Sequence, residues 1–259
     1  MSEQLPHEMI PSEKRPADKK FEKLPFKDKI ARPPFTMAII APIGQGKSSL
    51  IYTMLNTWYN KYFDELIVYN GTLDSNQAWL DLPAKEVIVI NEWNEKEFFD
   101  YIKALEKSQL ALIKSGKPPL NVGIVFDDMI TDSIFSRGRS TALDQFIIKI
   151  RHVPASLIMS SQSYKLISTT ARRNMTQIVL LPINQDEVEK VAEEHSGLAN
   201  KDEFIKMYKS VVTKQPRNYM VIDYRAPVAE RFKERFDEVI PYLKDEEKKK
   251  KKDGSKETK

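Results

Sequence analysis

The segment Ala41-Pro42-Ile43-Gly44-Gln45-Gly46-Lys47-Ser48 constrains the fold of this chain more than any other. It matches the phosphate-binding loop pattern G-x-x-x-x-G-K-[ST], with Ala41 in place of the first glycine. An apolar run at 37–40 enters the loop, and an amphipathic run at 49–55 leaves it. This is the order of a strand that delivers a glycine-rich loop to the start of a helix. The segment therefore predicts an α/β fold built on a strand–loop–helix unit.

The residue types of this loop also predict its chemistry. Glycines let the backbone curl so that its N–H groups point at phosphate oxygens. Lys47 is predicted to contact the β- and γ-phosphates of a nucleotide, and Ser48 to place its hydroxyl on Mg²⁺. The predicted nucleotide-binding residues are Ala41, Pro42, Ile43, Gly44, Gln45, Gly46, Lys47, Ser48 and Ser49.

A second motif, Phe126-Asp127-Asp128, is acidic and ends an apolar run that starts at Val122. Ligands of open α/β sheets bind at the carboxyl ends of such strands. Asp127 is therefore predicted to hold Mg²⁺ together with Ser48, and Asp128 to polarise the attacking water. Many ATPases carry Glu at the second position, and Asp128 is one methylene shorter. Together the two motifs predict ATP and Mg²⁺ as cofactors.

Apolar runs and helical patterns alternate through the middle of the chain, which predicts a mostly parallel central sheet with helices on both faces. Strands are predicted at 36–41, 65–69, 86–90, 122–126, 155–159, 177–181 and 219–223. Helices are predicted at 47–59, 95–115, 141–150, 185–195, 202–212 and 229–239, with Asn94 and Asn184 as N-caps. Two predicted strands separate Ser48 from Asp127, which favours a P-loop NTPase of the RecA-like, added-strand type.

Polar and basic residues follow the acidic motif. The strand at 155–159 ends in Ser160-Ser161-Gln162-Ser163-Tyr164, and we expect Gln162 to sense the γ-phosphate. ATPases that work as rings often need a cation from a neighbouring subunit to stabilise charge on the γ-phosphoryl group. The spacing favours Arg151 for this role, and the other candidates are Arg137, Arg139, Arg172 and Arg173.

The charge of the chain lies mainly in its ends. Residues 1–33 carry eight Lys and Arg against six Asp and Glu, and residues 244–259 carry eight Lys against five acids. Residues 34–243 then carry 25 bases and 26 acids, so the formal charge of +4 is weak evidence for nucleic-acid binding. We expect an extended N-terminal arm at 1–33, a P-loop ATPase domain at 34–243 and a disordered Lys-rich tail at 244–259. That tail is either a solubilising segment or a phosphate-binding arm.

Composition excludes several classes of site. The chain has no Cys, which excludes a disulfide scaffold, a Cys-ligated zinc site and a thiol nucleophile. It has only three His, which disfavours a metal site built from His. No apolar run approaches the roughly 18–20 residues of a bilayer span, and the polar start Met1-Ser2-Glu3-Gln4 does not resemble a secretory signal. We therefore expect a soluble, intracellular protein without a membrane span.

The ordered series of motifs resembles the genome-packaging ATPases of double-stranded DNA viruses and virophage-like elements, the poxvirus-type branch of the FtsK–HerA group. The matching residues are Phe35-Thr36-Met37 before the phosphate loop, Phe126-Asp127-Asp128, Arg151-His152, Ser161-Gln162-Ser163-Tyr164 and Ala171-Arg172-Arg173-Asn174. The resemblance covers roughly residues 35–223 and excludes both ends of the chain. It implies catalytic roles for Lys47, Asp128, Gln162 and a trans-acting Arg151.

The resemblance implies a translocase that packages double-stranded viral DNA into a preformed capsid by hydrolysing ATP. Its implied partners are double-stranded DNA, other copies of itself in a pentameric or hexameric ring, and a capsid or portal vertex. The implied location is the host cell cytoplasm or the viral assembly site. Contacts with DNA would go to the phosphate backbone, with Arg137, Arg139 and Lys165 as candidates.

Three alternatives remain open from the sequence. The first is another DNA-pumping or helicase ATPase of the same superfamily. The second is a P-loop kinase acting on a small molecule, which the Asp127-Asp128 pair and Gln162 disfavour because they suit activation of water. The third is a nucleotide-binding scaffold without turnover.

Overall fold

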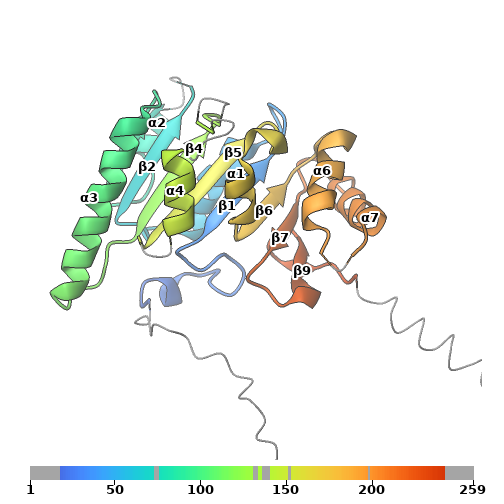
Figure 1. Ribbon diagram of the computed structural model, residues 1–259. Helices are drawn as coiled ribbons and strands as arrows, with labels where there is room; N and C mark the ends of the chain where they lie inside the picture. Colours follow the sequence, from blue (N-terminus) through green and yellow to red (C-terminus); the bar gives the residue numbers. More distant parts are fainter. Residues whose placement is uncertain are drawn as a thin grey trace, which may run out of the picture.

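The computed structural model describes residues 18–72, 76–130, 134–135, 141–150, 153–197 and 199–242. These residues form one nine-stranded sheet in the order β3-β2-β4-β5-β1-β6-β7-β8-β9 (Figure 1). The strands are β1 (Thr36–Ile40), β2 (Glu65–Asn70), β3 (Glu86–Ile90), β4 (Val122–Asp127), β5 (Ala155–Ser161), β6 (Gln177–Leu180), β7 (Met220–Asp223), β8 (Phe232–Glu234) and β9 (Glu238–Val239).

The first six strands are parallel, and β7, β8 and β9 extend the sheet in antiparallel fashion. Strand β5 lies between β1, which leads to the phosphate loop, and β4, which ends in the acidic motif. This insertion is the added strand that the spacing of the two motifs predicts. The α/β class with a mostly parallel sheet is therefore confirmed.

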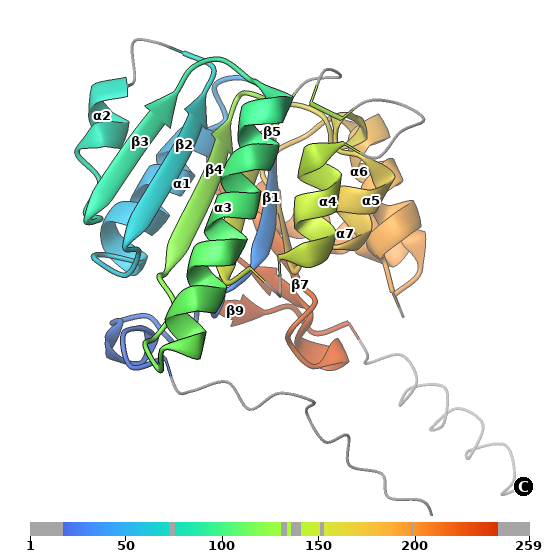
Figure 2. The ribbon, with the colours of Figure 1, turned by 60° about the vertical axis from the view of Figure 1, so that its left-hand side comes forward.

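Helices cover both faces of the sheet (Figures 1 and 2). They are α1 (Lys47–Thr53), which continues into a π-helical turn (Met54–Trp58), then α2 (Asn76–Leu80), α3 (Glu95–Lys114), α4 (Ala142–Lys149), α5 (Thr169–Arg173), α6 (Gln185–His195) and α7 (Lys201–Val212). Strand residues alternate between two hydrophobic clusters: Ala38 and Ile40 pack with α3 to α7, and Met37 and Ile39 pack with α1 and α2. Burial on both faces explains why the interior strands β1, β2, β4, β5 and β6 are continuous apolar runs.

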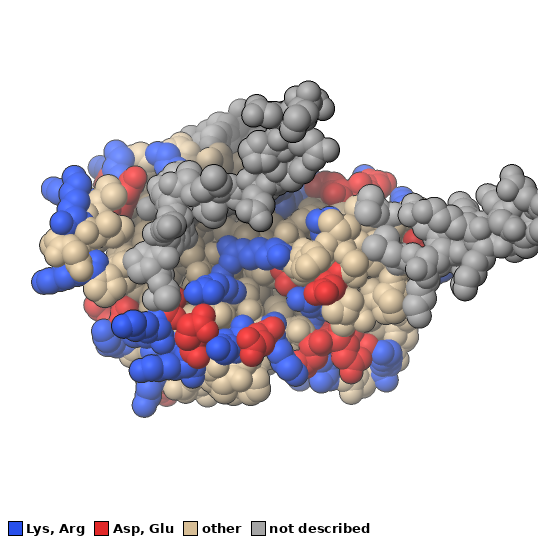
Figure 3. Space-filling model, turned by 90° about the horizontal axis from the view of Figure 1, so that it is seen from below, with Lys and Arg blue, Asp and Glu red and all other residues tan. Residues whose placement is uncertain are grey.

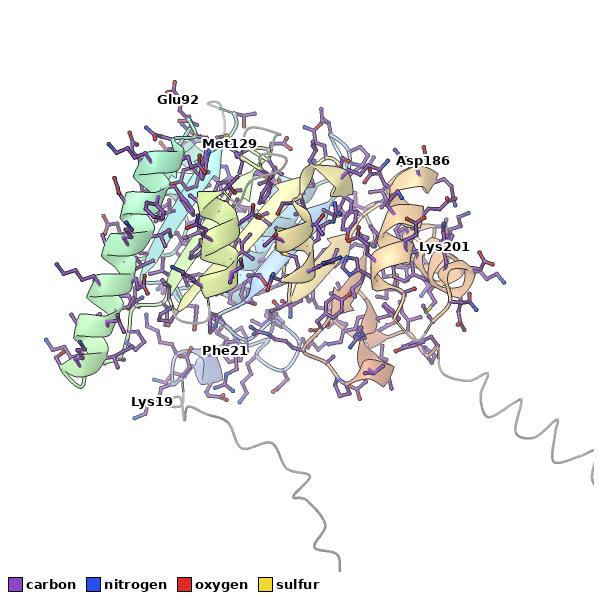
Figure 4. All side chains as sticks on the ribbon, in the orientation of Figure 1. Lys19, Phe21, Glu92, Met129, Asp186 and Lys201 are labelled. Carbon is purple, nitrogen blue, oxygen red and sulfur yellow. The ribbon has the colours of Figure 1, made fainter. Side chains whose placement is uncertain are left out.

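The chain before β1 belongs to the second cluster. Phe21, in the short 3-10 helix Phe21–Lys23, and Leu24 are buried against the α1 side of the sheet. The Tyr59 hydroxyl donates a hydrogen bond to the Ala31 carbonyl at 2.6 Å. Figure 4 shows Phe21 at the end of the molecule opposite Glu92 and Met129, which follow β3 and β4. The division of the chain at residue 33 remains a prediction, but residues 18–35 contribute to the core.

The predicted elements agree with the structure except at the C-terminal side. The Asn94 side chain caps α3 by accepting from the Lys96 and Glu97 N–H groups, and Asn184 caps α6. The predicted helix at 229–239 is wrong, because this segment forms a 3-10 turn (Val228–Glu230) and the hairpin of β8 and β9. Phe232 and Phe236 have helical spacing, yet they bury in different clusters on opposite faces of the sheet. Pairing with the free edge of β7 overrides the local helical pattern.

Within the described residues, no helix is both long and apolar enough to span a membrane. The longest, α3, is amphipathic, with Phe98, Ile102 and Leu105 buried against the sheet.

Candidate nucleotide-binding site

The loop between β1 and α1 has the conformation that its glycines allow. Gly44 and Gly46 have φ values of 79° and 92°, a region that side chains with a Cβ rarely adopt. Lys47 begins α1 and is only 4% exposed. Its Nζ donates to the carbonyl oxygens of Ala41 at 2.9 Å and Pro42 at 3.1 Å. The loop therefore folds around the ammonium group of Lys47.

Asp127 is the last residue of β4, and its carboxylate is buried beside this loop. Ser160 Oγ donates to its Oδ1 at 2.8 Å. Burial raises the pKa of Asp127, while hydrogen bonds from Ser48 and Ser160 act in the opposite direction. Ser48 and Asp127, the two predicted metal ligands, thus lie within hydrogen-bond reach of each other.

Asp128 follows β4 with a φ of 53°, an uncommon value for a residue with a side chain. Its carboxylate lies 3.5 Å from Lys47 Nζ, and its backbone N–H donates to Ser160 Oγ at 3.0 Å. Gln162 Nε2 donates to Asp128 Oδ1 at 3.4 Å. The structure therefore brings the ends of β1, β4 and β5 together around Lys47.

The turn that carries Gln162 is anchored to α6. Glu187, in the first turn of α6, accepts from Ser163 Oγ at 2.7 Å and from the Tyr164 N–H at 2.6 Å. Figure 4 places Met129, next to Asp128, and Asp186, next to Glu187, at the same upper edge of the molecule. This is the edge formed by the carboxyl ends of the parallel strands, where open α/β sheets bind ligands.

Of the predicted basic residues, Arg173 is exposed at the end of α5. The others fall into three groups. Arg137, Arg139 and Arg151 lie outside the described residues. Lys165 is exposed in the 3-10 turn Tyr164–Leu166, next to the Gln162 turn. Arg172 is engaged within the chain itself, because it pairs with Glu194 at 2.9 Å and lies over the Tyr164 ring.

Residues that the sequence alone does not single out also shape the site. Ser160 bridges the two aspartates across neighbouring strands. Gly71, after β2, lies so close to Asp128 that a Cβ there would be 2.8 Å from the Asp128 carbonyl oxygen. Arg217, before β7, lies beside Gly46 of the loop. The sequence offers one signal for Ser160: it is a small polar residue at the end of a buried strand.

The arrangement suits a nucleoside triphosphate with a divalent cation. A buried ammonium group, Lys47, is held by backbone carbonyls and a carboxylate that an anionic phosphate can replace. Ser48 and Asp127 supply hydroxyl and carboxylate oxygens, the ligand type that Mg²⁺ prefers. The residues present therefore fit both groups.

Solved structures with the same architecture include viral and bacterial ATPases. The genome packaging NTPase B204 of Sulfolobus turreted icosahedral virus 2, solved with AMP, matches with a TM-score of 0.55 and 16% identity. That match covers 82% of this chain and 100% of the B204 chain. The conjugation coupling protein TcpA of pCW3 matches with a TM-score of 0.51 and 14% identity, over 73% of this chain and 57% of TcpA. At these identities the likeness concerns the fold.

Sequence relatives are viral. The DNA packaging protein OPG160 of vaccinia virus (strain Copenhagen) is 22% identical over 208 residues, which cover 78% of this chain and 73% of OPG160. OPG160 of monkeypox virus has the same identity, over 65% of its length. Residues 20–251 match the family described as Poxvirus A32 protein, which is most of the chain. The chain therefore belongs to the Poxvirus A32 protein family.

Proposed function

We propose that this protein is an ATP-hydrolysing translocase that packages double-stranded viral DNA into a preformed capsid. Membership of the Poxvirus A32 family and similarity to viral DNA packaging proteins support the task. The likeness to B204, a packaging NTPase solved with ATP-gammaS, supports the use of ATP.

One observation carries the enzymatic part of the proposal. Lys47, Asp127, Asp128 and Gln162 come from the ends of three neighbouring strands, and hydrogen bonds or an ion pair connect them. A binding scaffold needs the loop alone, whereas hydrolysis also needs a carboxylate and an amide near the terminal phosphate. Their convergence favours turnover of ATP.

Each residue has a distinct proposed role. Lys47 binds the β- and γ-phosphates, and Ser48 and Asp127 hold Mg²⁺, which neutralises phosphate charge when bound. Asp128 polarises the attacking water as the base, and Gln162 contacts the γ-phosphate and senses its hydrolysis. The contacts of Asp128 with Lys47 and Gln162 support these roles.

The remaining partners follow from the same proposal. The working form is a ring of identical subunits, a pentamer or hexamer, in which Arg151 acts on the site of its neighbour. DNA phosphates contact Lys165, Arg137 and Arg139, and the ring docks on a capsid or portal vertex. Lys165 lies at the edge that carries the site. On the opposite face, Lys and Arg side chains are interspersed with Asp and Glu (Figure 3).

The test is the rate of ATP hydrolysis with and without double-stranded DNA. We expect DNA to stimulate the wild-type protein, and Lys47→Ala to lower the rate on the order of a hundredfold, because a positioned cation is lost. Lys206→Ala, on the exposed side of α7, is the control. ATP binding without hydrolysis, in the presence of Mg²⁺ and DNA, would contradict the proposal.

Two further measurements separate the alternatives. Robust strand displacement would favour a helicase, and phosphate transfer to a nucleoside or sugar without DNA stimulation would favour a kinase. Mixing Lys47→Ala with Arg151→Ala subunits should restore part of the activity if Arg151 acts across the subunit interface. If Arg151→Ala alone keeps full DNA-stimulated activity, its assignment is wrong.

A further inference from the structure

The sheet order defines which way a nucleotide held by the phosphate loop must point. This inference rests on the proposed function. Asp128 and Gln162 lie on the β4 and β5 side of β1, and Lys47 pairs with Asp128 on that side. The terminal phosphate therefore lies toward β5. The opposite end of the nucleotide, its nucleoside, lies on the other side of β1, toward β6 and β7.

A cavity of about 420 Å³ lies on that side of the loop. Gln45 and Gly46 of the loop and Leu50 of α1 line one part of it, and Trp58, Arg217 and Phe236 line another. Pockets for small ligands typically measure about 300–1,000 Å³ and are mostly apolar with a few polar groups. The cavity is thus large enough for a base and a ribose, and it is continuous with the phosphate loop.

Aromatic rings supply the apolar part of this cavity. The rings of Trp58 and Phe236 are 5.2 Å apart between centroids, and those of Tyr219 and Phe236 are 6.0 Å apart. Trp58 is only partly buried, so part of its ring borders the cavity. Such rings bind the faces of nucleobases, whichever base is present.

Arg217 supplies a cation between the loop and these rings. A Cβ built on Gly46 would lie 3.4 Å from its Cδ and 3.8 Å from its Nε, so the side chain passes across the loop. Within the part of the chain that the structure describes, Arg217 makes no hydrogen bond or ion pair. The guanidinium of Arg235, in contrast, is tied to Asn218 Oδ1 at 3.0 Å. An unpaired guanidinium beside a phosphate loop suits a phosphate oxygen.

Two distant segments close this cavity. Phe26 and Ile30, from the segment before β1, line it together with Phe236 from the turn between β8 and β9. Lys29 Nζ and Asp237 Oδ1 join the two segments by an exposed ion pair of 2.7 Å. The cavity therefore depends on elements that lie outside the strand–loop–helix unit.

We propose that this cavity is the nucleoside subsite of the protein, in which the Trp58 ring takes the base of a nucleoside 5′-phosphate and Arg217 pairs with its α-phosphate. Its ligand class is the nucleoside monophosphate portion of the nucleotide. Lys47 and the loop hold the outer phosphates, so the two halves of the ligand are bound by separable groups.

Isothermal titration calorimetry with AMP and with inorganic tripolyphosphate tests this subsite independently of hydrolysis. We expect Arg217→Ala to weaken AMP binding about tenfold, as for the loss of one charge-assisted hydrogen bond. Trp58→Leu should weaken AMP about fivefold or more and leave tripolyphosphate within about twofold. Lys47→Ala should weaken tripolyphosphate binding and leave AMP affinity within about twofold. Arg32→Ala is the matched control, because Arg32 is exposed, pairs with Glu22 and does not line the cavity.

The outcomes distinguish the two proposals. Unchanged AMP affinity in both Arg217→Ala and Trp58→Leu, with tripolyphosphate weakened by Lys47→Ala, would overturn the subsite and leave the ATPase proposal intact. Unchanged tripolyphosphate affinity in Lys47→Ala would overturn the ATPase proposal itself. Arg217 is exposed, so its variant remains informative even if Trp58→Leu lowers the stability of the fold.

Discussion

At the scale of single residues, Ser160 is the group that ties the two aspartates to one another. Its hydroxyl accepts from the Asp128 N–H and donates to Asp127 Oδ1, so one side chain uses both of its hydrogen-bonding roles. It is fully buried at the tip of β5. The left-handed conformation of Asp128 depends on a partner at this position, because its backbone N–H turns toward the neighbouring strand.

Ser160→Ala should therefore disturb both stability and catalysis. The substitution removes the partner of the part-buried Asp128 N–H and of the buried Asp127 Oδ1, which costs about 1–3 kcal/mol in the free energy of unfolding. We expect the rate of ATP hydrolysis to fall by about tenfold or more, because Asp128 loses its orientation. Urea denaturation and steady-state kinetics check the two effects. Ser108→Ala is the control, because it removes a hydroxyl that donates to a carbonyl of α3. Equal kinetics for the two variants would contradict the role of Ser160 in orienting Asp128.

Substitutions at Gly71 and Gly123 should separate an effect on activity from an effect on stability. A Cβ at Gly71 would lie 2.8 Å from the Asp128 carbonyl oxygen, so Gly71→Ala should displace Asp128. A Cβ at Gly123 would lie 2.6 Å from Leu66 Cδ2, inside the hydrophobic cluster. We expect Gly71→Ala to lose more activity than stability and Gly123→Ala to lose more stability than activity. Thermal melts and ATPase rates of the two variants measure this difference. If both variants lost activity and stability in the same proportion, the prediction would be wrong.

The sequence predicts those site residues that are contiguous along the chain. Lys47 and Ser48 belong to one loop, and Asp127 and Asp128 to one strand end, so a motif reveals them. Ser160 acts only through the register of β4 with β5, and Arg217 reaches the loop from far along the chain. Neither contact has a local sequence pattern, and the structure was needed to find them.

At the scale of elements, local patterns predict the parallel strands well, including the edge strand β3, and the antiparallel hairpin poorly. The parallel strands other than β3 are buried on both faces, so hydrophobicity identifies them. β3 lies at the edge and is partly exposed, yet it is also an apolar run. The hairpin of β8 and β9 forms because β7 offers an unpaired edge, and helical spacing of Phe232 and Phe236 gives no hint of that edge. In this segment, pairing with the distant strand β7 outweighs the local helical propensity, and a hairpin forms in place of a helix.

Helix α6 acts as a support for the Gln162 turn, and Glu187 carries that support. We expect Glu187→Ala to lower kcat while KM for ATP changes by about twofold or less, because the turn loses its anchor and the loop does not. Glu187→Gln should recover part of kcat, since its amide oxygen can still accept from the Tyr164 N–H. Equal losses in the Ala and Gln variants, or a change confined to KM, would argue against a positioning role.

At the scale of the whole molecule, one buried cluster joins the turn after β5 to the antiparallel extension of the sheet. His195, at the end of α6, contacts the hydroxyls of Tyr164, after β5, and Tyr224, after β7. Arg172 lies over Tyr164 and Arg231 over Tyr224, and Glu194 binds both Arg172 and the Tyr164 hydroxyl. The stability of the whole sheet thus depends in part on the charge state of His195.

Burial lowers the pKa of His195 from 6.5 to about 4, with Arg172 acting in the same direction and Glu194 against it. The folded protein keeps the ring neutral, whereas the unfolded chain takes up a proton near pH 6.5. Stability contributed by the neutral ring is therefore present above pH 6.5 and is lost as the pH falls toward 4. Between pH 7.5 and pH 5 the loss amounts to about 2 kcal/mol.

His195→Gln keeps a polar side chain between the two tyrosines but cannot be protonated in this range. The variant should be less stable than the wild type at pH 7.5, because the fit of the ring is lost. The difference should shrink by about 2 kcal/mol at pH 5, since only the wild type then loses the contribution of a neutral imidazole. Urea denaturation of both proteins at the two pH values measures this. A difference that stays constant with pH would mean that His195 has the same pKa folded and unfolded, and that its cluster is open to water.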